Sequence, residues 1–402
     1  FAISPRLAGL IAKDKGRLSR FDSTKAYFFN ADGTPKTTGT ILKNPQYADT
    51  LAQIAINGAN AFYSGNIAKD IVETVQSAPG NPGVLGLQDF ANYRTKERVP
   101  VCAPYQSYDI CGMGPPSSGA LTVGQILSIT EKFDLKKLGA DNPTSWQIIS
   151  DASRLAFADR GRYMADSDYV PMPTQGLLDS GYIAERAKLI TPNKALESVS
   201  AGSPPWSHAM RLADDESIEL PSTSHFNVVD SEGNVVSITT TIENAFGSRL
   251  MVRGFLLNNE LTDFSFKTHK DGAPIANRLE PGKRPRSSMS PTIIMQDGKP
   301  YMAIGSPGGS RIIGYVAQSI IAHLQWGMDI QQAINQPHLV NRFGTLDIEK
   351  GTAAESMQST LEGMGHKVNI RDLNSGLHAI RLTKDGLEGA ADPRREGAAI
   401  GE

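Results

Sequence analysis

The chain has 402 residues, of which 40% are hydrophobic and 20% are charged, so it is long enough to bury one large core or two ordinary ones. Its 40 basic and 42 acidic residues are mixed along the sequence and leave a formal charge of −2, which excludes a nucleic-acid-binding footprint and a polybasic membrane tail. No apolar run reaches the roughly 18 residues that a membrane span needs, because the closest candidate, Ile312 to Trp326, is interrupted by polar side chains and predicts a buried helix.

The first half of the chain is predicted to be mainly helical. Apolar residues recur at three- and four-residue spacing in 45–65 and 66–77, and the segment 142–164 carries an apolar stripe along one helical face. Another helix is predicted to follow Gly119. The proline- and glycine-containing stretch 192–222 predicts an exposed, mobile loop.

The only two cysteines stand on either side of a predicted turn near Gln106–Ser107. Cys102 and Cys111 lie at about equal distance from this turn, so the two would face each other across a hairpin. A disulfide there would suit an oxidising compartment, and two buried free thiols fit the sequence equally well. The seven histidines are scattered and no zinc-like spacing exists, so neither a metal nor another cofactor is expected.

The second half changes to pairs of strands. Strands are predicted at 224–230 and 234–242, and further hairpins turn at Asp297–Gly298 and Asp385–Gly386. Helices are predicted between them, at 310–326 and 353–364. Hairpins with helices grouped between them indicate an α+β layered fold built on antiparallel sheet.

A cluster of hydroxyl residues opens the first of these hairpins. Ser222 and Thr223 precede a strand, and three threonines end the next strand. If the turn centres on Glu232, Thr223 lies opposite Thr241, and a contact between their hydroxyls across the strands becomes geometrically natural. Threonine is also a favoured strand residue, so this pattern alone indicates no site.

Two glycines follow a predicted strand in the segment GSPGGSRII. Gly308 and Gly309 precede a helix that is expected to begin at about Ser310. Adjacent glycine amides at a helix start can hold an anion, and the segment does not match a phosphate-binding loop. An oxyanion hole for acyl transfer is therefore the better interpretation.

Polar residues that could hold a substrate occur in two further segments. Glu243 ends the threonine run, and Glu260 and Asp263 follow an apolar strand, so three carboxylates could surround an ammonium group. Ser287 and Ser288 precede another strand and could hydrogen-bond a carboxylate. Without a fold that brings them together, these residues would be solvated acids and turn-forming serines.

The segments TSHFNVVDSEGNVVSITTTIE, LLNNELTDFS, GKRPRSSMSPTI, GSPGGSRII and DPRREGAA occur together and in the order of the γ-glutamyltranspeptidases. The chain closely resembles this family of N-terminal nucleophile hydrolases over nearly its whole length. MGPPSSG at 113–119 and RLAFADRGRYMADSDYVP at 154–171 also resemble segments of the family's large subunit. The resemblance implies a four-layer αββα sandwich.

The resemblance also implies a mechanism. The precursor would cleave itself between Ser222 and Thr223, and the freed Thr223 would attack a γ-glutamyl amide such as glutathione or glutamine. Thr241 would orient the nucleophile, and Gly308 and Gly309 would hold the oxyanion. The acyl group would pass to water, an amino acid or a peptide. The substrate's ammonium and carboxylate groups would be held by Glu243, Glu260, Asp263, Ser287 and Ser288.

His225 lies two residues after the nucleophile, which suggests a catalytic triad with His225 as the proton carrier. A supporting or strand-edge position is favoured for it over the role of proton carrier, because a free N-terminal amine can itself serve as the base.

By this resemblance, residues 1–222 are a portion of the large subunit, residues 223–402 are the small catalytic subunit, and the two would form a heterodimer after cleavage. The portion before Thr223 is shorter than the family's large subunit, so we expect a missing N-terminal segment that carries the carboxylate-binding arginine. The loop between Asp263 and Ser287 is also shorter than in members with a closing lid. A periplasmic or secreted location follows from the bacterial type. Two alternatives remain, a glutaryl or cephalosporin acylase on the same fold and a truncated non-catalytic homologue.

Overall fold

The computed structural model describes residues 1–208, 210–215, 217 and 222–401. The chain divides into two compact units. Unit 1 comprises residues 1–97 and 242–260, and unit 2 comprises residues 98–241 and 261–402. Each unit is described by itself.

Unit 1 is mostly helical. Its helices are α1 (Pro5–Lys13), α2 (Lys15–Leu18), α3 (Asp22–Phe28), α4 (Pro45–Asn57), α5 (Ala59–Tyr63), α6 (Asn66–Gln76) and α7 (Leu87–Asn92). One short hairpin, β5 (Met251–Val252) with β6 (Phe255–Leu256), belongs to its second segment. The buried ion pair between Arg249 and Asp14, at 2.8 Å, ties that second segment to the helices.

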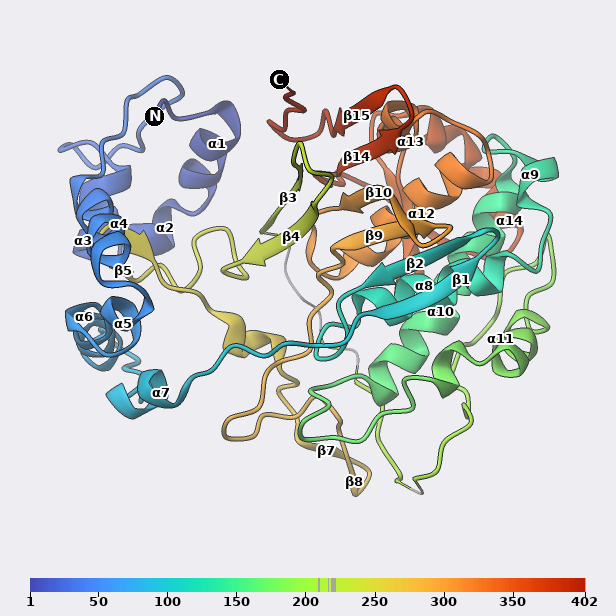
Figure 1. Ribbon diagram of the computed structural model, residues 1–402, viewed down its shortest axis with the longest axis horizontal. Coiled ribbons are helices and arrows are strands. Elements are labelled where there is room, and N and C mark those ends of the chain that lie inside the picture. Colours follow the sequence, from blue (N-terminus) through green and yellow to red (C-terminus); the bar gives the residue numbers. More distant parts are fainter. Residues whose placement is uncertain (209, 216, 218–221, 402) are drawn as a thin grey trace. The chain divides into compact units, whose positions relative to one another are not determined.

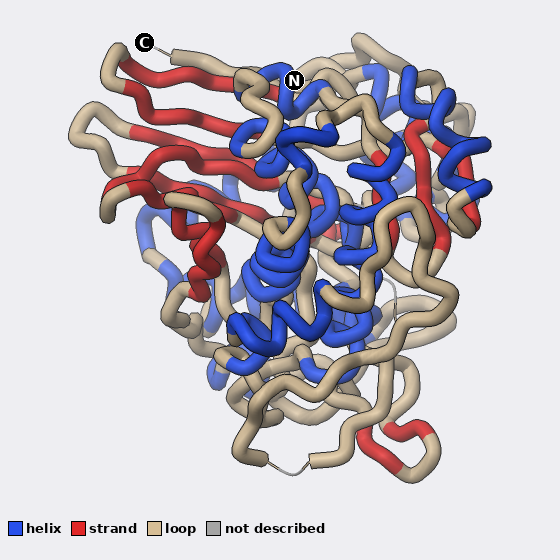
Figure 2. Tube along the Cα trace, turned by 90° about the vertical axis from the view of Figure 1, so that its right-hand side faces the viewer, coloured by secondary structure: helices blue, strands red, loops and turns tan. Residues whose placement is uncertain are grey.

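Unit 2 is built on a six-stranded antiparallel sheet (Figure 1). In spatial order its strands are β1 (Val101–Tyr105), β2 (Tyr108–Gly112), β9 (Thr292–Gln296), β10 (Lys299–Gly305), β14 (His378–Thr383) and β15 (Gly386–Ala391). The turns at Gln106–Ser107 and Asp297–Gly298 lie where the sequence predicts them. The turn predicted at Asp385–Gly386 lies one residue earlier, at Lys384–Asp385, because Gly386 already pairs with Thr383 as the first residue of β15. Figure 2 shows these strands side by side, with helices packed along the sheet.

Helices cover one face of this sheet. Helices α8 (Gly119–Thr130), α12 (Ile312–Leu324) and α13 (Ile330–Asn335) contact the sheet directly. The further helices of the unit are α9 (Leu135–Leu138), α10 (Pro143–Tyr163), α11 (Ser180–Ala187) and α14 (Gln358–Gly363). The largest buried cluster joins Ile294 and Ile304 of the sheet to Val123 of α8, Ile149 of α10 and Val316 of α12. Burial of this apolar face is the main stabilising term for the unit.

Smaller elements complete the unit. A three-stranded sheet contains β11 (Leu339–Asn341), β12 (Thr345–Glu349) and β13 (Lys367–Arg371), and β7 (His269–Lys270) pairs with β8 (Ala273–Pro274). Single 3₁₀ turns lie at η1 (Gly176–Leu178), η3 (Gly309–Arg311) and η4 (Ala353–Met357), and η2 (Glu260–Asp263) stands at the border of the two units. The described part of 192–222 contains neither a helix nor a strand, as predicted, although Leu212 and Ala213 in it are buried.

A separate hairpin lies against the sheet. Strands β3 (Thr223–Val229) and β4 (Val235–Thr241) pair with each other and pack beside β10, and β3 also packs beside β14 (Figure 1). Unit 2 therefore stacks a hairpin on a larger antiparallel sheet, and helices cover the other face of that sheet. The prediction of an α+β fold with antiparallel sheets flanked by helices is confirmed.

The structure decides between the two states that the sequence left open for the cysteines. Cys102 and Cys111 are directly opposite each other in β1 and β2, and they form a disulfide. Strand β1 lies at the edge of the sheet, so the disulfide links this edge strand covalently to its neighbour β2.

We expect reduction of this disulfide to lower the free energy of unfolding by about 2–3 kcal/mol, because a cross-link over a short loop mainly limits the unfolded chain. Cys102 is exposed, so a reductant has access to the bond. Denaturant unfolding with and without dithiothreitol measures the change. The Cys102→Ser, Cys111→Ser double variant should show no response to dithiothreitol, and an unchanged wild-type midpoint on reduction would contradict the expectation.

Candidate active site

The predicted register of the β3–β4 hairpin is confirmed. Thr223, the first residue of β3, lies opposite Thr241, the last residue of β4. Successive side chains of a strand point to opposite faces, so Thr223 and His225 face inward and are 4% and 5% exposed, whereas Ser224 and Phe226 face outward and are exposed. The hairpin thus presents a buried threonine hydroxyl at its open end.

His225 is held in one orientation between the hairpin and the sheet. Asn227 donates from Nδ2 to the His378 carbonyl at 2.9 Å, so its Oδ1 faces the ring and accepts from Nε2 of His225 at 3.1 Å. The other ring nitrogen, Nδ1, accepts from the Thr239 hydroxyl at 2.8 Å. The ring lies over Gly305 of β10, where an added Cβ would be 2.2 Å from Cε1.

Burial lowers the pKa of His225 to about 4, and the hydrogen bond to Asn227 only partly opposes this. The ring is therefore neutral at neutral pH, and both of its nitrogens contact strand residues. This geometry matches the supporting position that the sequence favours for His225 and holds the inner face of the hairpin on the sheet.

The glycine pair forms the turn between β10 and α12. Gly308 has φ +146° and Gly309 has φ +59°, conformations that glycine adopts without strain. A Cβ on Gly308 would also be 2.7 Å from the Tyr315 ring. The first amides of a helical turn have no partner within the helix, so this turn can supply hydrogen-bond donors to an anion.

Ser287 and Ser288 are held in place by hydrogen bonds from Ser118, just before α8, and from Arg160. The backbone carbonyl of Ser287 accepts from both the amide and the hydroxyl of Ser118, each at 2.7 Å. Ser288 is fully buried, and its hydroxyl accepts from Nη2 of Arg160 in α10 at 2.7 Å. Arg160 also donates to the Ser118 hydroxyl at 2.7 Å, so one guanidinium orients the side chains of Ser118 and Ser288.

Asp263 is linked to the same region through Asn277. This buried asparagine donates from Nδ2 to the Asp263 carbonyl at 2.8 Å and accepts on Oδ1 from the Arg286 amide at 2.9 Å. Asp263 is itself buried. The structure therefore connects Asp263 to the segment that carries Ser287 and Ser288.

Glu243 and Glu260 belong to unit 1. Asn259 donates from Nδ2 to the Glu243 carboxylate at 2.5 Å and accepts on Oδ1 from the Asn244 amide at 3.0 Å. These two hydrogen bonds stabilise the chain at Glu243, which has φ +69°. The Glu260 amide donates to Asn258 at 2.9 Å. The assembly of these two carboxylates around Thr223 stays a prediction.

A guanidinium that the sequence did not single out touches the predicted nucleophile. Arg395 donates from Nη1 to the backbone carbonyl of Thr223 at 3.0 Å. Four side chains donate hydrogen bonds to predicted site residues, either to a backbone carbonyl or to a side chain: those of Arg160, Asn259, Asn277 and Arg395. The spacing of residues in the sequence does not predict such contacts. The resemblance of DPRREGAA to a family segment was the only pointer to Arg395.

Comparison with known sequences decides the family. The family described as gamma-glutamyltranspeptidase matches residues 1–402. This chain belongs to the γ-glutamyltranspeptidase family.

Two members of this family show how much of a relative the chain spans. The glutathione hydrolase proenzyme of Escherichia coli (strain K12) is 37% identical over 390 residues, which are 94% of this chain and 64% of that protein. The glutathione hydrolase proenzyme of Bacillus subtilis (strain 168) is 36% identical and is matched over 100% of this chain and 68% of its own length. The chain thus spans about two thirds of the length of these relatives.

A solved structure supports the fold of this γ-glutamyltranspeptidase family member. The cephalosporin acylase from Bacillus halodurans superposes with a TM-score of 0.84, covering 100% of this chain and 72% of that one at 23% identity. At this identity the likeness concerns the fold alone.

Within residues 1–208, 210–215, 217 and 222–401, no helix is long and apolar enough to cross a membrane. The same described residues contain no group of three or more His, Cys, Asp or Glu side chains that could hold a metal ion.

We expect His225 to make stability depend on pH in one window. Its pKa falls from 6.5 to about 4 on folding, so the neutral ring stabilises the fold above pH 6.5, and this contribution of about 3 kcal/mol is lost as the pH falls toward 4. Denaturant unfolding of the wild type and of His225→Gln, measured at several pH values, tests this. The variant should be less stable at pH 7, and the difference should shrink on acidification.

Burial also lowers the pKa of His323, His338 and His378, so these histidines add to the pH dependence of stability in the wild type. The difference in stability between the wild type and His225→Gln isolates the contribution of His225. A constant difference between wild type and variant from pH 7 to pH 4.5 would contradict the assignment to His225.

Proposed function

We propose that the protein hydrolyses and transfers γ-glutamyl groups from glutathione and other γ-glutamyl amides, with Thr223 as the nucleophile. The observation that carries the proposal is the position of Thr223, buried at the start of β3 and opposite Thr241, in a chain of the γ-glutamyltranspeptidase family. The known relatives named above are glutathione hydrolase proenzymes, which supports this substrate class.

Maturation would begin with attack of the Thr223 hydroxyl on the carbonyl carbon of Ser222. The peptide C–N bond breaks, the amide nitrogen gains the hydroxyl proton, and an ester joins Ser222 to Thr223. Water then hydrolyses the ester to a Ser222 carboxylate and a free Thr223. Residues 1–222 and 223–402 become the large-subunit portion and the small subunit of a heterodimer.

The free α-amine is the base for the reaction with substrate. Such amines have a pKa of about 7.7–8, so an appreciable fraction is unprotonated at neutral pH. The amine takes the Thr223 hydroxyl proton as the oxygen attacks the γ-carbonyl, and it passes this proton to the leaving amine. Water or the amine of an acceptor then cleaves the resulting γ-glutamyl ester.

The other residues have roles that follow their chemistry. Thr241 lies opposite Thr223 and orients its hydroxyl, and the turn with Gly308 and Gly309 stabilises the oxyanion. Glu243, Glu260 and Asp263 bind the substrate's ammonium group. Ser287 and Ser288 bind its carboxylate, with Arg160 holding Ser288 in place.

A periplasmic or secreted location suits these features. The disulfide between Cys102 and Cys111 is typical of proteins from oxidising compartments, and the relatives named above are bacterial.

Replacing the nucleophile tests the proposal. We expect Thr223→Ala to give one uncleaved chain and at least about a 10³-fold loss of γ-glutamyl release, because neither self-cleavage nor acyl transfer has an attacking oxygen. Denaturing gels, N-terminal sequencing and γ-glutamyl-4-nitroanilide turnover measure these effects. Thr240→Ala is the matched control, since Thr240 is exposed on the outer face of the same hairpin. Cleavage before residue 223 in Thr223→Ala would refute the proposed site.

A comparison of acyl groups separates this function from that of a glutaryl or cephalosporin acylase. Glutaryl lacks the α-ammonium group, so three carboxylates in the substrate site should favour γ-glutamyl over glutaryl anilide by about 100-fold in kcat/KM. Asp263→Asn should reduce this preference, mainly by raising KM for the γ-glutamyl substrate. Faster turnover of the glutaryl anilide would support the acylase function instead, and turnover of neither would support a non-catalytic homologue.

A further inference from the structure

We infer that Arg395 is a positioning residue for the nucleophile: it fixes the backbone of Thr223 and is needed for the chemical step rather than for substrate binding. The inference rests on the proposed role of Thr223. It starts from the hydrogen bond of 3.0 Å that Nη1 of Arg395 donates to the Thr223 carbonyl oxygen.

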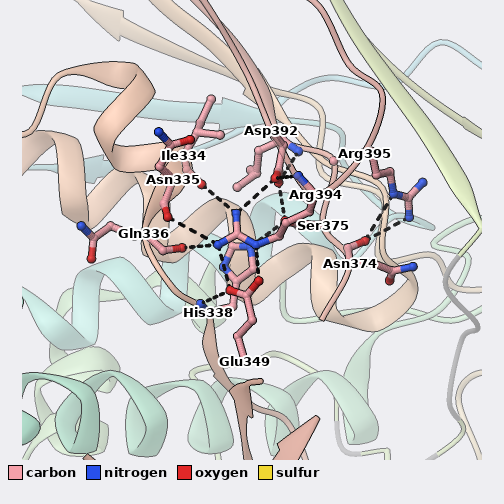
Figure 3. A network of polar contacts seen from close by, with 12 residues as sticks. Ile334, Asn335, Gln336, His338, Glu349, Asn374, Ser375, Asp392, Arg394 and Arg395 are labelled. Atoms are coloured by element: carbon pink, nitrogen blue, oxygen red, sulfur yellow. Dashed lines mark hydrogen bonds and ion pairs between the residues drawn. The ribbon is translucent and has the colours of Figure 1, made fainter. Parts of the chain in front are cut away.

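The same guanidinium is anchored on its other side. Both Nε and Nη2 of Arg395 donate to the carbonyl oxygen of Asn374, at 3.3 Å and 3.1 Å (Figure 3). The planar guanidinium has its donors in a fixed arrangement, so a group held at Asn374 can place the Thr223 carbonyl with little freedom.

The loop that anchors Arg395 also reaches the glycine turn. A Cβ on Gly376 would be 2.7 Å from Cδ of Arg395 and 2.7 Å from Cγ of Pro307, so only glycine lets both side chains approach the backbone here. The Gly376 amide donates to Ser306 at 3.2 Å. One loop therefore sets the position of Arg395 and supports the residues just before Gly308.

The chain segment that carries Arg395 is fixed by its neighbour. Arg394 donates to both carboxylate oxygens of Glu349, at 2.5 Å and 2.8 Å, and to Asp392 at 3.1 Å. Asp392 accepts in turn from the Leu377 amide at 3.1 Å and from the Ser375 hydroxyl (Figure 3). The guanidinium of Arg394 binds these acids and nearby carbonyls, whereas that of Arg395 points to Thr223.

A nucleophile at the end of a strand needs such an anchor. Thr223 has a pairing partner in β4, and after cleavage no residue would precede it, so its carbonyl would be the first backbone carbonyl of the new chain. Its amine and hydroxyl are attached to the adjacent Cα and Cβ and move with that carbonyl. Displacing a reacting group by about 1 Å can cost about 10²-fold in rate.

The test compares Arg395→Gln, Arg395→Lys and a control in the whole protein. The control is Arg381→Gln, since Arg381 forms an ion pair with Glu388 between β14 and β15 and is likewise partly exposed. We measure kcat and KM for γ-glutamyl-4-nitroanilide per free Thr223 N-terminus, together with the rate of self-cleavage and the unfolding midpoint. Arg395→Gln should lower kcat by about 10- to 100-fold and change KM by less than about threefold.

Arg395→Lys should recover part of kcat, because an ammonium group can still donate to one carbonyl, and Arg381→Gln should behave as wild type. A folded Arg395→Gln protein that fails to cleave itself also supports the inference, since self-cleavage uses the same placement of Thr223. Should Arg395→Gln not fold, Arg395→Lys decides by the same split between kcat and KM.

Unchanged kcat in Arg395→Gln, or a rise in KM alone, would overturn the inference. Failure of the proposed function is distinguishable, because wild-type protein would then show neither a Thr223 N-terminus nor γ-glutamyl release. A wild type that is active while Arg395→Gln is equally active refutes the positioning role only.

Discussion

The register of one hairpin is the constraint on which the site depends. Pairing Thr223 with Thr241 sends Thr223, His225 and Asn227 to one face of β3, and a slip of one residue would send all three to the other face. The inner face is held on the sheet by side chains that bond across the layers, since Asn227 contacts the His378 carbonyl and the His225 ring lies over Gly305. Placement of the predicted nucleophile thus follows from strand pairing before any catalytic group is considered.

Backbone groups rather than ion pairs hold the surroundings of Thr223. Its carbonyl is bound by Arg395, whose own anchor is the Asn374 carbonyl, and Ser306 accepts from the Gly376 amide. The ion pairs of Arg394 with Glu349 and Asp392 fix the chain that carries Arg395 (Figure 3). Buried polar groups that all find partners specify one arrangement, which is what a reacting threonine needs.

The proposed cleavage would break the backbone and leave the two products packed together in one fold. Strands β1 and β2 precede Ser222 and pair through β9 with strands that follow it, so one sheet contains both products. Arg160 in α10 likewise precedes the bond and holds Ser288 beyond it. A released N-terminus at Thr223 would therefore form within an assembly that stays packed, and the two proposed products would remain a heterodimer.

The sequence by itself determined the elements and their local pairing. Alternation of apolar and polar residues and the position of the turn set the pairing of Thr223 with Thr241 and of Cys102 with Cys111, because hairpin register depends on residues that are close in the chain. The order of motifs determined the family. Tertiary structure alone decided that the cysteines are bonded, that His225 is buried and neutral, and that Arg160, Asn277 and Arg395 hydrogen-bond to the predicted site residues Ser288, Asp263 and Thr223. These contacts join residues far apart in sequence through backbone carbonyls and single side chains, which leave no periodic pattern in the chain, so only the folded arrangement reveals them.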